Sequence, residues 1–298
     1  MKVLLYGKDG WIGNQVYNLL NLSNHEVIIG KCRAESTFEL EQEILSVKPT
    51  NIISLIGRTH GNINNKVYST IDYLEQPGKL KENVRDNLYS PITLAILAQK
   101  NNIHYTYLGT GCIFKFDDPE YPFGKEENGF TEQSVPNFFD SSYSIMKGYT
   151  DRLMHLFEDN VLNIRIRMPI TGDYNKRNFI TKIVTYDKIC SVSNSMTVLP
   201  ELLPILIDMA DKKVTGTVNL TNPGLINHNE ILEMYKEIVD PNFTWINFTL
   251  EEQAKILDSG RSNNFLDTTR LQSMYNIKNI KDSVRDMLYL MKDQPKDF

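Results

Sequence analysis

The stretch KVLLYGKDGWIGN, residues 2–14, joins an apolar strand to a helix through a turn rich in glycine. Gly7, Gly10 and Gly13 follow the strand and reach into the first turn of the helix. Glycine suits this place because the backbone must turn tightly and let a pyrophosphate approach bare amides at a helix N-terminus. An ordinary glycine-rich turn is the alternative, but the strand before and the helix after favour a dinucleotide-binding site.

The rest of the first half alternates short apolar runs with segments of helical periodicity. The expected strands are 2–7, 25–30, 51–57, 103–109 and 162–168, and the expected helices are 11–23, 36–48, 81–101 and 142–159. Such alternation predicts βαβ units with right-handed crossovers. The sequence therefore predicts an α/β fold with a Rossmann-type doubly wound parallel sheet over residues 1–170.

The pattern changes beyond residue 170, where short strands and helices follow each other less regularly. The expected strands are 178–184, 189–199 and 216–224, and the expected helices are 200–213, 227–240 and 249–257. Thr249 and Glu252 fit a capping box at the start of the last helix. We expect residues 171–298 to form a smaller C-terminal α/β lobe that binds substrate and does not continue the sheet. Residues 115–141 are rich in proline and glycine and predict one long loop.

Composition limits the class of protein. The 298 residues are 41% hydrophobic, enough for a large core, and the net charge of −5 comes without a basic run. This balance predicts neither a nucleic-acid partner nor a membrane partner, and no apolar stretch fits a signal peptide or a membrane span. Cys32, Cys112 and Cys190 are odd in number and far apart, which predicts neither disulfides nor a metal site. We therefore expect a soluble cytoplasmic protein.

The end of the second expected strand selects between two cofactors. NAD sites place an acidic residue there to bind the ribose 2′-hydroxyl, whereas this chain has Lys31 and Arg33. A cation favours a 2′-phosphate, so we expect NADPH bound by Arg33, with NADH as the alternative because Glu35 lies close by. Further cofactor contacts are expected beside the glycines, after the third strand and in the next helix, from Asp9, Trp11, Ile12, Gly57, Arg58, Thr59 and Asn87.

Two places in the chain read Tyr-x-x-x-Lys, namely Tyr121/Lys125 and Tyr143/Lys147. The first pair encloses a proline and a glycine and cannot form a regular helix, whereas the second lies in the helix expected over 142–159. Residues four apart on a helix share one face. There the Lys147 cation would lower the pKa of the Tyr143 phenol and bind the cofactor ribose. A solvated surface pair is the alternative interpretation.

Thr110 ends the strand before this helix, at the sheet edge where ligands bind in doubly wound folds. Its hydroxyl would bind a substrate carbonyl beside Tyr143. Thr110, Tyr143 and Lys147 together resemble the catalytic trio of the extended short-chain dehydrogenase/reductase family. The resemblance covers the whole chain, because FLDTTRL near the C-terminus resembles the nucleotide-sugar branch that includes dTDP-4-dehydrorhamnose reductase.

Cys112 and its neighbours indicate which enzymes of this family the chain resembles. The sugar-nucleotide dehydratases of the family have an acidic pair after the threonine, whereas this chain has Gly111 and Cys112. GTGCIF is similar to the GDP-fucose synthases, which are 3,5-epimerase/4-reductases with a cysteine at this place. The chain resembles the plant UDP-4-keto-6-deoxyglucose 3,5-epimerase/4-reductases, or UDP-L-rhamnose synthases, more closely. The runs that carry this likeness are YGKDGWIG, TGCIF, RIRMPI, RNFITKI, NSMTVL, LTNPG, HNEILEMY, FTLEEQAK and RSNN.

The resemblance implies a reaction with two stages. A 4-keto group acidifies C3 and C5, and each inversion needs a base on one face of the sugar ring and an acid on the other. Cys112 and Lys182 are the implied pair, Lys182 standing where fucose synthases have a histidine, and which of them is the base stays open. Thr110 and Tyr143 would stabilise the oxyanion at O4, and NADPH would then reduce C4 to give UDP-L-rhamnose. A UDP-glucose 4,6-dehydratase would supply the substrate in trans.

The nucleotide half of the substrate is assigned by the same resemblance. Arg261 would bind the diphosphate through its guanidinium group, Asn178 and Phe179 would lie near the sugar and diphosphate, and Asn194 would lie along the uracil. A plain turn is the alternative for Asn194. Diphosphate binding is the alternative for Lys182.

Two other functions stay open at this stage. A reductase acting on an already epimerised sugar would leave Cys112 an inert buried thiol. The regulatory subunit of methionine adenosyltransferase shares the fold and is a binding partner, although an intact catalytic trio argues for an enzyme. By family analogy we also expect a homodimer through the helices 81–101 and 143–159.

Overall fold

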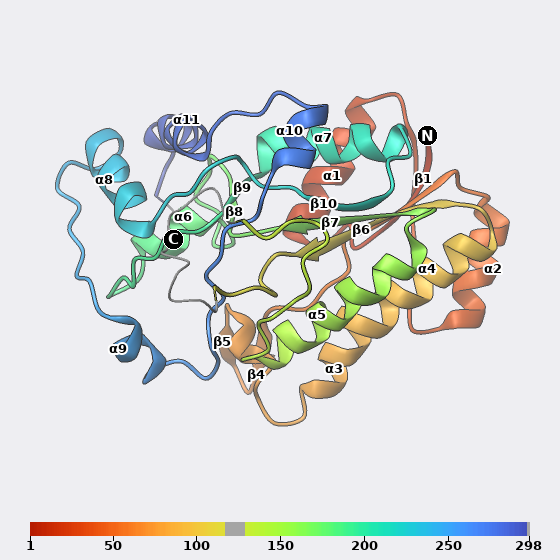
Figure 1. Ribbon diagram of the computed structural model, residues 1–298, viewed down its shortest axis with the longest axis horizontal. Helices are drawn as coiled ribbons and strands as arrows, with labels where there is room; N and C mark the ends of the chain where they lie inside the picture. The colour runs from red at the N-terminus through yellow and green to blue at the C-terminus, as the bar shows by residue number, and fades with distance from the viewer. Residues whose placement is uncertain (117–128, 297–298) are drawn as a thin grey trace.

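The computed structural model describes residues 1–116 and 129–296. Six strands form one central sheet in the order β10-β7-β6-β3-β1-β2, and every neighbouring pair is parallel (Figure 1). The strands are β1 (Lys2–Tyr6), β2 (Glu26–Ile29), β3 (Asn51–Ser54), β6 (His104–Thr110), β7 (Val161–Ile166) and β10 (Gly216–Asn219). The predicted α/β class with a parallel Rossmann-type sheet is therefore confirmed.

Helices cover both faces of the sheet because alternate residues of the central strands point to opposite sides. Val3 and Leu5 of β1 pack in one core cluster with α1 (Trp11–Leu22) and α7 (Leu199–Asp211). Leu4 and Tyr6 pack in another with α2 (Thr37–Val47) and α4 (Ser90–Lys100). Figure 1 shows these two helical layers above and below the sheet. Burial on both faces explains why β1 is a continuous apolar run.

The second half of the chain does continue the sheet, so the prediction that it does not is wrong. β10 pairs with β7 in parallel, with Val218 opposite Ile164, and α7 joins the layer of α1. A strand of four residues is too short for its pattern to reveal which sheet it extends. The division of labour between residues 1–170 and 171–298 remains a prediction.

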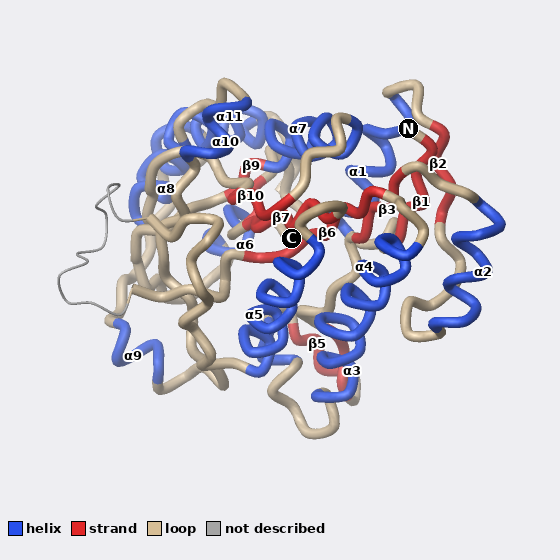
Figure 2. Tube along the Cα trace, turned by 45° about the vertical axis from the view of Figure 1, so that its right-hand side comes forward, coloured by secondary structure: helices blue, strands red, loops and turns tan. Residues whose placement is uncertain are grey.

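A separate core lies beyond the edge of the sheet and contains Ile180, Ile231 and Val284. It is built from α6 (Phe179–Val184), α8 (His228–Ile238), α11 (Ile280–Lys292) and a small sheet of β8 (Pro169–Ile170) and β9 (Thr197–Val198). Two short helices are α9 (Leu250–Ala254), which begins with the predicted capping box, and α10 (Thr269–Met274). Figure 2 shows α8 and α9 at the end of the molecule opposite β2.

All three strands expected in this lobe are wrong or shorter than expected, and that of 216–224 is reduced to β10. The segment 178–184 is helix α6, because the buried Asn178 side chain caps it by accepting a hydrogen bond from the Ile180 amide at 3.2 Å. Within 189–199 only β9 is a strand. A short mixture of apolar and polar residues fits either period, and the cap decides between them.

The helix predicted over 81–101 is present but changes its winding in the middle. It consists of α3 (Leu80–Val84), a π-helical turn η2 (Arg85–Tyr89) and α4. Pro91 has no amide hydrogen, so the Asn87 carbonyl cannot be paired four residues further on. The Thr150 hydroxyl of the neighbouring helix α5 (Ser142–Met154) donates to that carbonyl at 2.6 Å. The proline is tolerated because another helix satisfies the freed carbonyl.

A hairpin lies between β3 and α3 and was not predicted. It comprises β4 (Gly61–Ile63) and β5 (Lys66–Tyr68), and the 3-10 turn η1 (Ile71–Tyr73) follows it. Asn64 and Asn65 at its tip have φ values of 48° and 66°, as a tight two-residue turn requires. Ile63 and Tyr73 pack against Tyr143 near the start of α5, which ends in the 3-10 turn η4 (His155–Phe157). The hairpin therefore forms one wall at the carboxyl edge of the sheet.

Candidate active site

The glycine turn lies where the chain leaves β1 for β2 on one side and later returns to β3 on the other. Such a switch point opens a crevice at the carboxyl edge of the sheet. Gly7 has a φ of +84°, and a Cβ there would lie 2.8 Å from the Leu55 carbonyl carbon. A Cβ on Gly13 would lie 1.9 Å from the Gly7 carbonyl oxygen. Gly10 caps α1 without a side-chain hydrogen bond, so this turn fits a pyrophosphate against bare amides.

The three residues predicted to be catalytic lie close together. Thr110 ends β6, and Tyr143 and Lys147 lie one turn apart on α5. All three are buried. Ser141 caps α5 by accepting from the Ser144 amide at 3.0 Å, which fixes the first turn that carries the tyrosine.

The pKa of the Tyr143 phenol is shifted in the direction opposite to the one predicted. Burial raises the pKa of the phenol, the neighbouring Cys112 adds to the rise, and a hydrogen bond with Thr110 opposes it. Lys147 does not lower the phenol pKa, because its Nζ donates to the Tyr107 hydroxyl at 2.8 Å. Burial lowers the Lys147 pKa to about 7, with Asp86 acting in the opposite direction. The site therefore holds a protonated phenol beside a lysine that loses its proton readily.

Cys112 lies within reach of the trio. Its amide donates to the Thr110 hydroxyl at 3.0 Å, and its carbonyl accepts from the Ser144 hydroxyl at 2.9 Å. The side chain is half-buried in a cluster with Tyr73 and Tyr143. The thiol and the phenol therefore belong to one site, as the sequence predicts.

Lys182, the other predicted epimerisation residue, comes from the second lobe. It is half-buried on α6, and among the described residues its ammonium group makes no hydrogen bond or ion pair. Burial first, and then Arg177 and Arg261, lower its pKa to about 8. An amine with these neighbours is partly uncharged near neutral pH and can act as a base.

Two residues that sequence reasoning missed lie among the same cations. Burial lowers the pKa of His60, which follows β3, to about 4, and Arg177, Arg58, Lys182 and Lys176 add to the effect. Arg177 is half-buried. The basic pair at 176–177, directly before the cap of α6, was the signal for Arg177. Nothing in the sequence pointed to the histidine, because cations from both lobes meet there only in the fold.

Arg261 is paired with an acid from the other half of the chain. Its Nη2 lies 2.6 Å from Asp72 Oδ2 and its Nη1 donates to Ser259 Oγ at 2.7 Å. Burial alone would raise the Asp72 pKa, but hydrogen bonds from Arg261 and Thr70 bring it below its usual value. An arginine expected at a diphosphate is thus present, half-buried and matched by a carboxylate.

Two residues predicted to contact substrate are used inside the protein instead. The fully buried Asn194 side chain accepts from Arg167 Nη2 at 2.6 Å and donates to Asn263 Oδ1 at 2.9 Å. Asn178 is also fully buried and donates to the Asp173 carbonyl at 2.7 Å while capping α6. Their side-chain polar atoms are occupied by these bonds, and their contact with substrate stays a prediction. Phe179 is half-buried, with its ring centroid 5.2 Å from that of His228.

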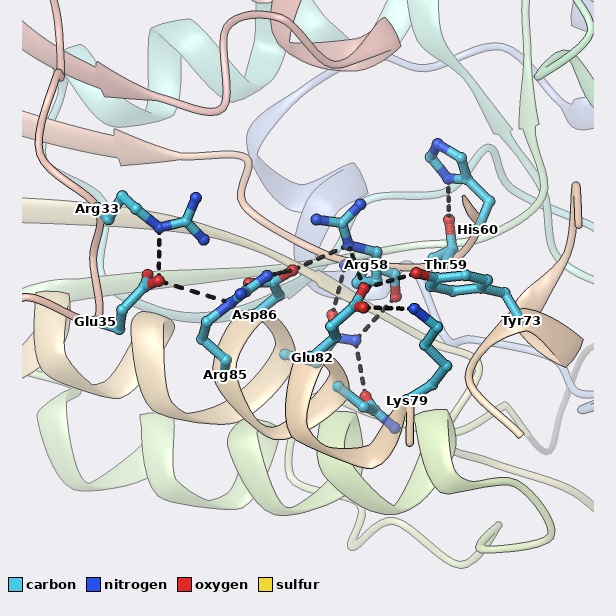
Figure 3. A network of polar contacts seen from close by, with 12 residues as sticks. Arg33, Glu35, Arg58, Thr59, His60, Tyr73, Lys79, Glu82, Arg85 and Asp86 are labelled. Carbon is cyan, nitrogen blue, oxygen red and sulfur yellow. Dashed lines mark hydrogen bonds and ion pairs between the residues drawn. The ribbon is translucent and has the colours of Figure 1, made fainter. Parts of the chain in front are cut away.

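The expected 2′-phosphate residue belongs to a row of alternating charges (Figure 3). Arg33 Nε lies 2.6 Å from Glu35 Oε1, and Arg85 Nε lies 3.8 Å from the same oxygen. Arg85 also pairs with Asp86 at 2.6 Å, and Arg58 pairs with Asp86 at 3.0 Å. The π-helical turn places Arg85 and Asp86 in this row. The guanidinium groups of Arg33 and Arg85 therefore both approach the Glu35 carboxylate, beyond the end of β2.

The segment after β3 is fixed by Asn87. Its Oδ1 accepts from the Arg58 amide at 3.0 Å and its Nδ2 donates to the Arg58 carbonyl at 2.9 Å. A Cβ on Gly57 would lie 3.6 Å from Lys147 Nζ, so the backbone passes close to the catalytic lysine. Thr59 Oγ1 contacts the His60 ring at 3.1 Å. Asn87 therefore positions the loop and is not exposed to a ligand itself.

The other residues predicted to contact the cofactor at the glycine turn differ in how exposed they are. Asp9 is almost fully exposed and pairs with Lys8 at 3.5 Å, whereas Trp11 and Ile12 are half-buried and pack against the core.

The alternative pair Tyr121/Lys125 lies outside the described residues. Within residues 1–116 and 129–296, no helix is long and apolar enough to cross a membrane. In the same ranges no three acidic, cysteine or histidine side chains are grouped to hold a metal.

A parallel Rossmann sheet with Thr110, Tyr143 and Lys147 at its carboxyl edge defines an extended short-chain dehydrogenase/reductase. No family model matches the chain. L780 of Acanthamoeba polyphaga mimivirus is 52% identical over 99% of this chain and 100% of its own length. The bifunctional dTDP-4-dehydrorhamnose 3,5-epimerase/dTDP-4-dehydrorhamnose reductase of Arabidopsis thaliana is 42% identical over 94% of this chain and 90% of its own. The chain belongs to the family of nucleotide-sugar 3,5-epimerase/4-reductases.

Solved structures agree with this assignment. The crystal structure of the L780 UDP-rhamnose synthase covers 98% of this chain and 99% of that chain with a TM-score of 0.93. A dTDP-4-dehydrorhamnose reductase from Bacillus anthracis, in complex with NADP, covers 96% of this chain and 98% of that chain. Its TM-score of 0.76 at 14% identity shows a shared fold alone.

A longer relative includes a further activity. The trifunctional UDP-glucose 4,6-dehydratase/UDP-4-keto-6-deoxy-D-glucose 3,5-epimerase/UDP-4-keto-L-rhamnose-reductase of Arabidopsis thaliana is 42% identical over 97% of this chain. The match spans only 42% of that protein's length. The relatives are enzymes, so the chain is an enzyme and the regulatory-subunit alternative is wrong.

Proposed function

We propose that the chain converts UDP-4-keto-6-deoxy-D-glucose into UDP-L-rhamnose by 3,5-epimerisation followed by reduction at C4. The observation that carries the proposal is the packing of Cys112 against Tyr143 in one cluster. A plain reductase needs the phenol and has no use for the thiol. The relatives support this pairing of reactions, since one is a UDP-rhamnose synthase and another is a bifunctional epimerase and reductase.

For the epimerisation, Lys182 is the base and Cys112 is the acid. The lowered Lys182 pKa, about 8, gives a share of uncharged amine at neutral pH. The amine would remove the proton from C3 or C5, and the thiol would protonate the opposite face of the enolate. Thr110 and Tyr143 would donate hydrogen bonds to O4, where the negative charge collects.

For the reduction, Tyr143 would donate its proton to O4. Burial raises the phenol pKa, which keeps the proton in place until the more basic alkoxide forms. NADPH, when bound, supplies the hydride for C4. Lys147 would bind the ribose hydroxyls of the cofactor, and Gly7, Gly10 and Gly13 would bind its pyrophosphate at the start of α1. Gly57 leaves room for the backbone to approach Lys147.

NADPH is proposed over NADH because of the charges beside β2. Arg33 is mostly exposed and paired with Glu35, and Arg85 approaches the same carboxylate. A 2′-phosphate would take the place of that carboxylate between two guanidinium groups. NADH would instead place its 2′-hydroxyl on Glu35 and remains the alternative.

The cations from both lobes would bind the substrate diphosphate. Arg261 and Arg177 carry guanidinium groups near Lys182, and the pairing of Arg261 with Asp72 would be exchanged for phosphate oxygens. Phe179 would lie near the sugar at the start of α6. The second lobe is thus proposed to bind the nucleotide-sugar.

A second copy of the chain is proposed as the partner of α4 and α5. Ile96, Tyr149 and Leu156 are 50%, 57% and 71% exposed on these helices and the turn that follows. An apolar face of this kind is typical of a protein interface. The expected homodimer would cover it.

The substrate must come from an enzyme that dehydrates UDP-glucose. We propose a separate UDP-glucose 4,6-dehydratase, because the corresponding activity precedes epimerisation in the name of the trifunctional Arabidopsis relative. A cytoplasmic location is proposed with it, which agrees with three free cysteines.

The test is incubation with UDP-4-keto-6-deoxyglucose in deuterated water, with and without NADPH, followed by NMR of C3 and C5. Deuterium should enter both positions without NADPH, and UDP-rhamnose should appear when NADPH is added. Cys112→Ala should lose the exchange, while Tyr143→Phe should lose mainly the reduction. Absence of exchange, together with NADPH oxidation on a pre-epimerised sugar, would reduce the protein to a simple reductase.

A further inference from the structure

A buried polar network lies behind the turn that carries Cys112. The Gly111 carbonyl accepts from Arg167 Nη1 at 3.1 Å and from Asn264 Nδ2 at 2.9 Å. The Phe114 carbonyl accepts from the same Asn264 amide at 2.9 Å and from the Ser262 hydroxyl at 2.6 Å. Residues from two distant segments, Arg167 in one and Ser262 with Asn264 in the other, therefore fix both ends of the turn.

Arg167 is the centre of this network and is only 1% exposed. Besides the Gly111 carbonyl, its guanidinium group donates to Ser262 Oγ at 2.9 Å, to the Ser262 carbonyl at 3.0 Å and to Asn194 Oδ1 at 2.6 Å. All these acceptors are neutral, and among the described residues Arg167 has no ion pair. Neutral acceptors satisfy hydrogen bonds but do not balance a buried charge.

Arg165, two residues earlier and within β7, is a buried arginine whose charge is balanced. Its side chain is also fully buried, but its Nε and Nη2 bind the two oxygens of Asp151 at 2.8 and 2.7 Å. A bidentate carboxylate balances that charge. Arg167 thus differs from Arg165 in having no matching carboxylate within residues 1–116 and 129–296.

Cys112 directly follows Gly111, whose carbonyl Arg167 holds, and its thiol interacts electrostatically with the guanidinium group. Burial lowers the pKa of the Arg167 guanidinium, and the negative form of Cys112 opposes the shift. Gly111 lies directly against the arginine, since a Cβ there would be 2.9 Å from Arg167 Cγ. Met168, directly after the arginine, has a φ of +38°, a conformation that is uncommon for a residue other than glycine.

We propose that Arg167 is a positioning residue for Cys112, which anchors the thiol's turn and balances the negative charge left on sulfur after proton transfer. The inference rests on the proposed function. When the enolate is protonated, the S–H bond breaks, the enolate electron pair forms the C–H bond, and a thiolate remains. A cation behind the turn would stabilise this negative charge, and the proton that Lys182 removed from carbon would then return to sulfur through solvent.

The test needs no substrate in its first part. Iodoacetamide would be reacted at pH 7 with the full chain, and labelling of Cys112 and Cys32 would be followed separately by peptide mass spectrometry. Cys32 lies beside Glu39 and Glu43 and serves as the internal reference. Arg167→Met should slow the alkylation of Cys112 about tenfold with Cys32 unchanged. Arg167→Lys keeps the charge and should stay within about threefold of the wild-type rate.

Arg165→Met is the matched control, because it removes a buried guanidinium only two residues away and should leave Cys112 alkylation unchanged. Thermal unfolding of each variant shows whether it is folded. If Arg167→Met is not folded, the alkylation rate of Cys112 in Arg167→Lys tests the proposal. A folded Arg167→Met with the wild-type alkylation rate, or a tenfold loss in folded Arg167→Lys, would overturn the proposal.

The second part of the test measures deuterium entry at C3 and C5, which should fall at least tenfold in Arg167→Met while the Kd for NADPH stays unchanged. If the wild-type protein exchanges no deuterium, the proposed function fails. The altered alkylation would still support the electrostatic role of Arg167, so the two failures can be told apart.

Discussion

The ammonium group of Lys147 on α5 lies 2.8 Å from the hydroxyl of Tyr107 on β6. Tyr107 is fully buried, and its own pKa is raised by that burial. The lysine therefore rests on a neutral partner, and burial lowers its pKa to about 7. An unfolded lysine has a pKa of about 10.4, so folding makes protonation of this side chain harder.

Replacing this lysine should stabilise the protein in a pH-dependent way. Because the unfolded state binds the extra proton between pH 7 and about 10, the penalty is complete below pH 7 and fades toward pH 10. We expect Lys147→Met to raise the free energy of unfolding by about 2 kcal/mol or more at pH 6.5, although activity is lost. Urea unfolding at pH 6.5 and pH 10 measures this. A gain that stays constant with pH would contradict the assignment of the low pKa.

The base assigned to Lys182 predicts a pH profile for epimerisation. With a pKa of about 8, the uncharged amine increases as pH rises, so deuterium entry without NADPH should rise through pH 8 and level off above it. Lys182→Met should lose exchange by about 100-fold or more. Lys188→Met, an exposed neighbour, serves as the control. A rate that falls above pH 8 would instead make Lys182 the acid.

Asp72 competes with the substrate diphosphate for Arg261. Replacing Asp72 with Asn removes the carboxylate that lies 2.6 Å from the guanidinium group, so UDP should bind about tenfold more tightly, equivalent to about 1.4 kcal/mol. Arg261→Met should weaken binding of UDP by a similar factor or more. Isothermal titration with UDP measures both variants. Weaker binding in Asp72→Asn would mean that the acid orients the arginine and does not compete.

Cofactor preference depends on Arg33 if the 2′-phosphate binds there. Arg33→Ala should weaken binding of 2′,5′-ADP by about tenfold or more, because a charge-assisted pair is lost, and should change binding of AMP little. Lys31→Met, on an exposed neighbouring side chain, should leave both ligands unaffected. Equal losses for the two ligands would place the phosphate elsewhere.

The π-helical turn depends on a hydroxyl from α5. Thr150→Val leaves the Asn87 carbonyl without its 2.6 Å donor and should lower the free energy of unfolding by about 1–3 kcal/mol. Thr150→Ser keeps the hydroxyl and should lose less. Chemical unfolding of the two variants compares them directly. If both lose equally, the methyl packing and not the hydrogen bond supports the turn.

Sequence patterns predicted those parts of the fold and of the candidate site that depend on residues close together in the chain. Gly13 was predicted because a tight strand-to-helix turn has no room for a side chain, and Tyr143 with Lys147 because four residues make about one helical turn. The strand expected at 178–184 was wrong because the Asn178 cap, and not periodicity, decides a six-residue segment. His60 beside Arg177 could not be predicted, since docking of two lobes brings them together.

The hydrogen bond from the Asn264 side-chain amide to the Gly111 carbonyl joins residues that are 153 positions apart in the chain. During synthesis on a ribosome, the thiol segment emerges long before the amide that fixes it exists. Strand β10 and helix α7, which complete the sheet and one of its covering layers, also come late. A product released early would thus display a cysteine on an unfinished scaffold, with neither half of the chemistry assembled. Activity should consequently switch on only when almost the entire polypeptide has left the exit tunnel.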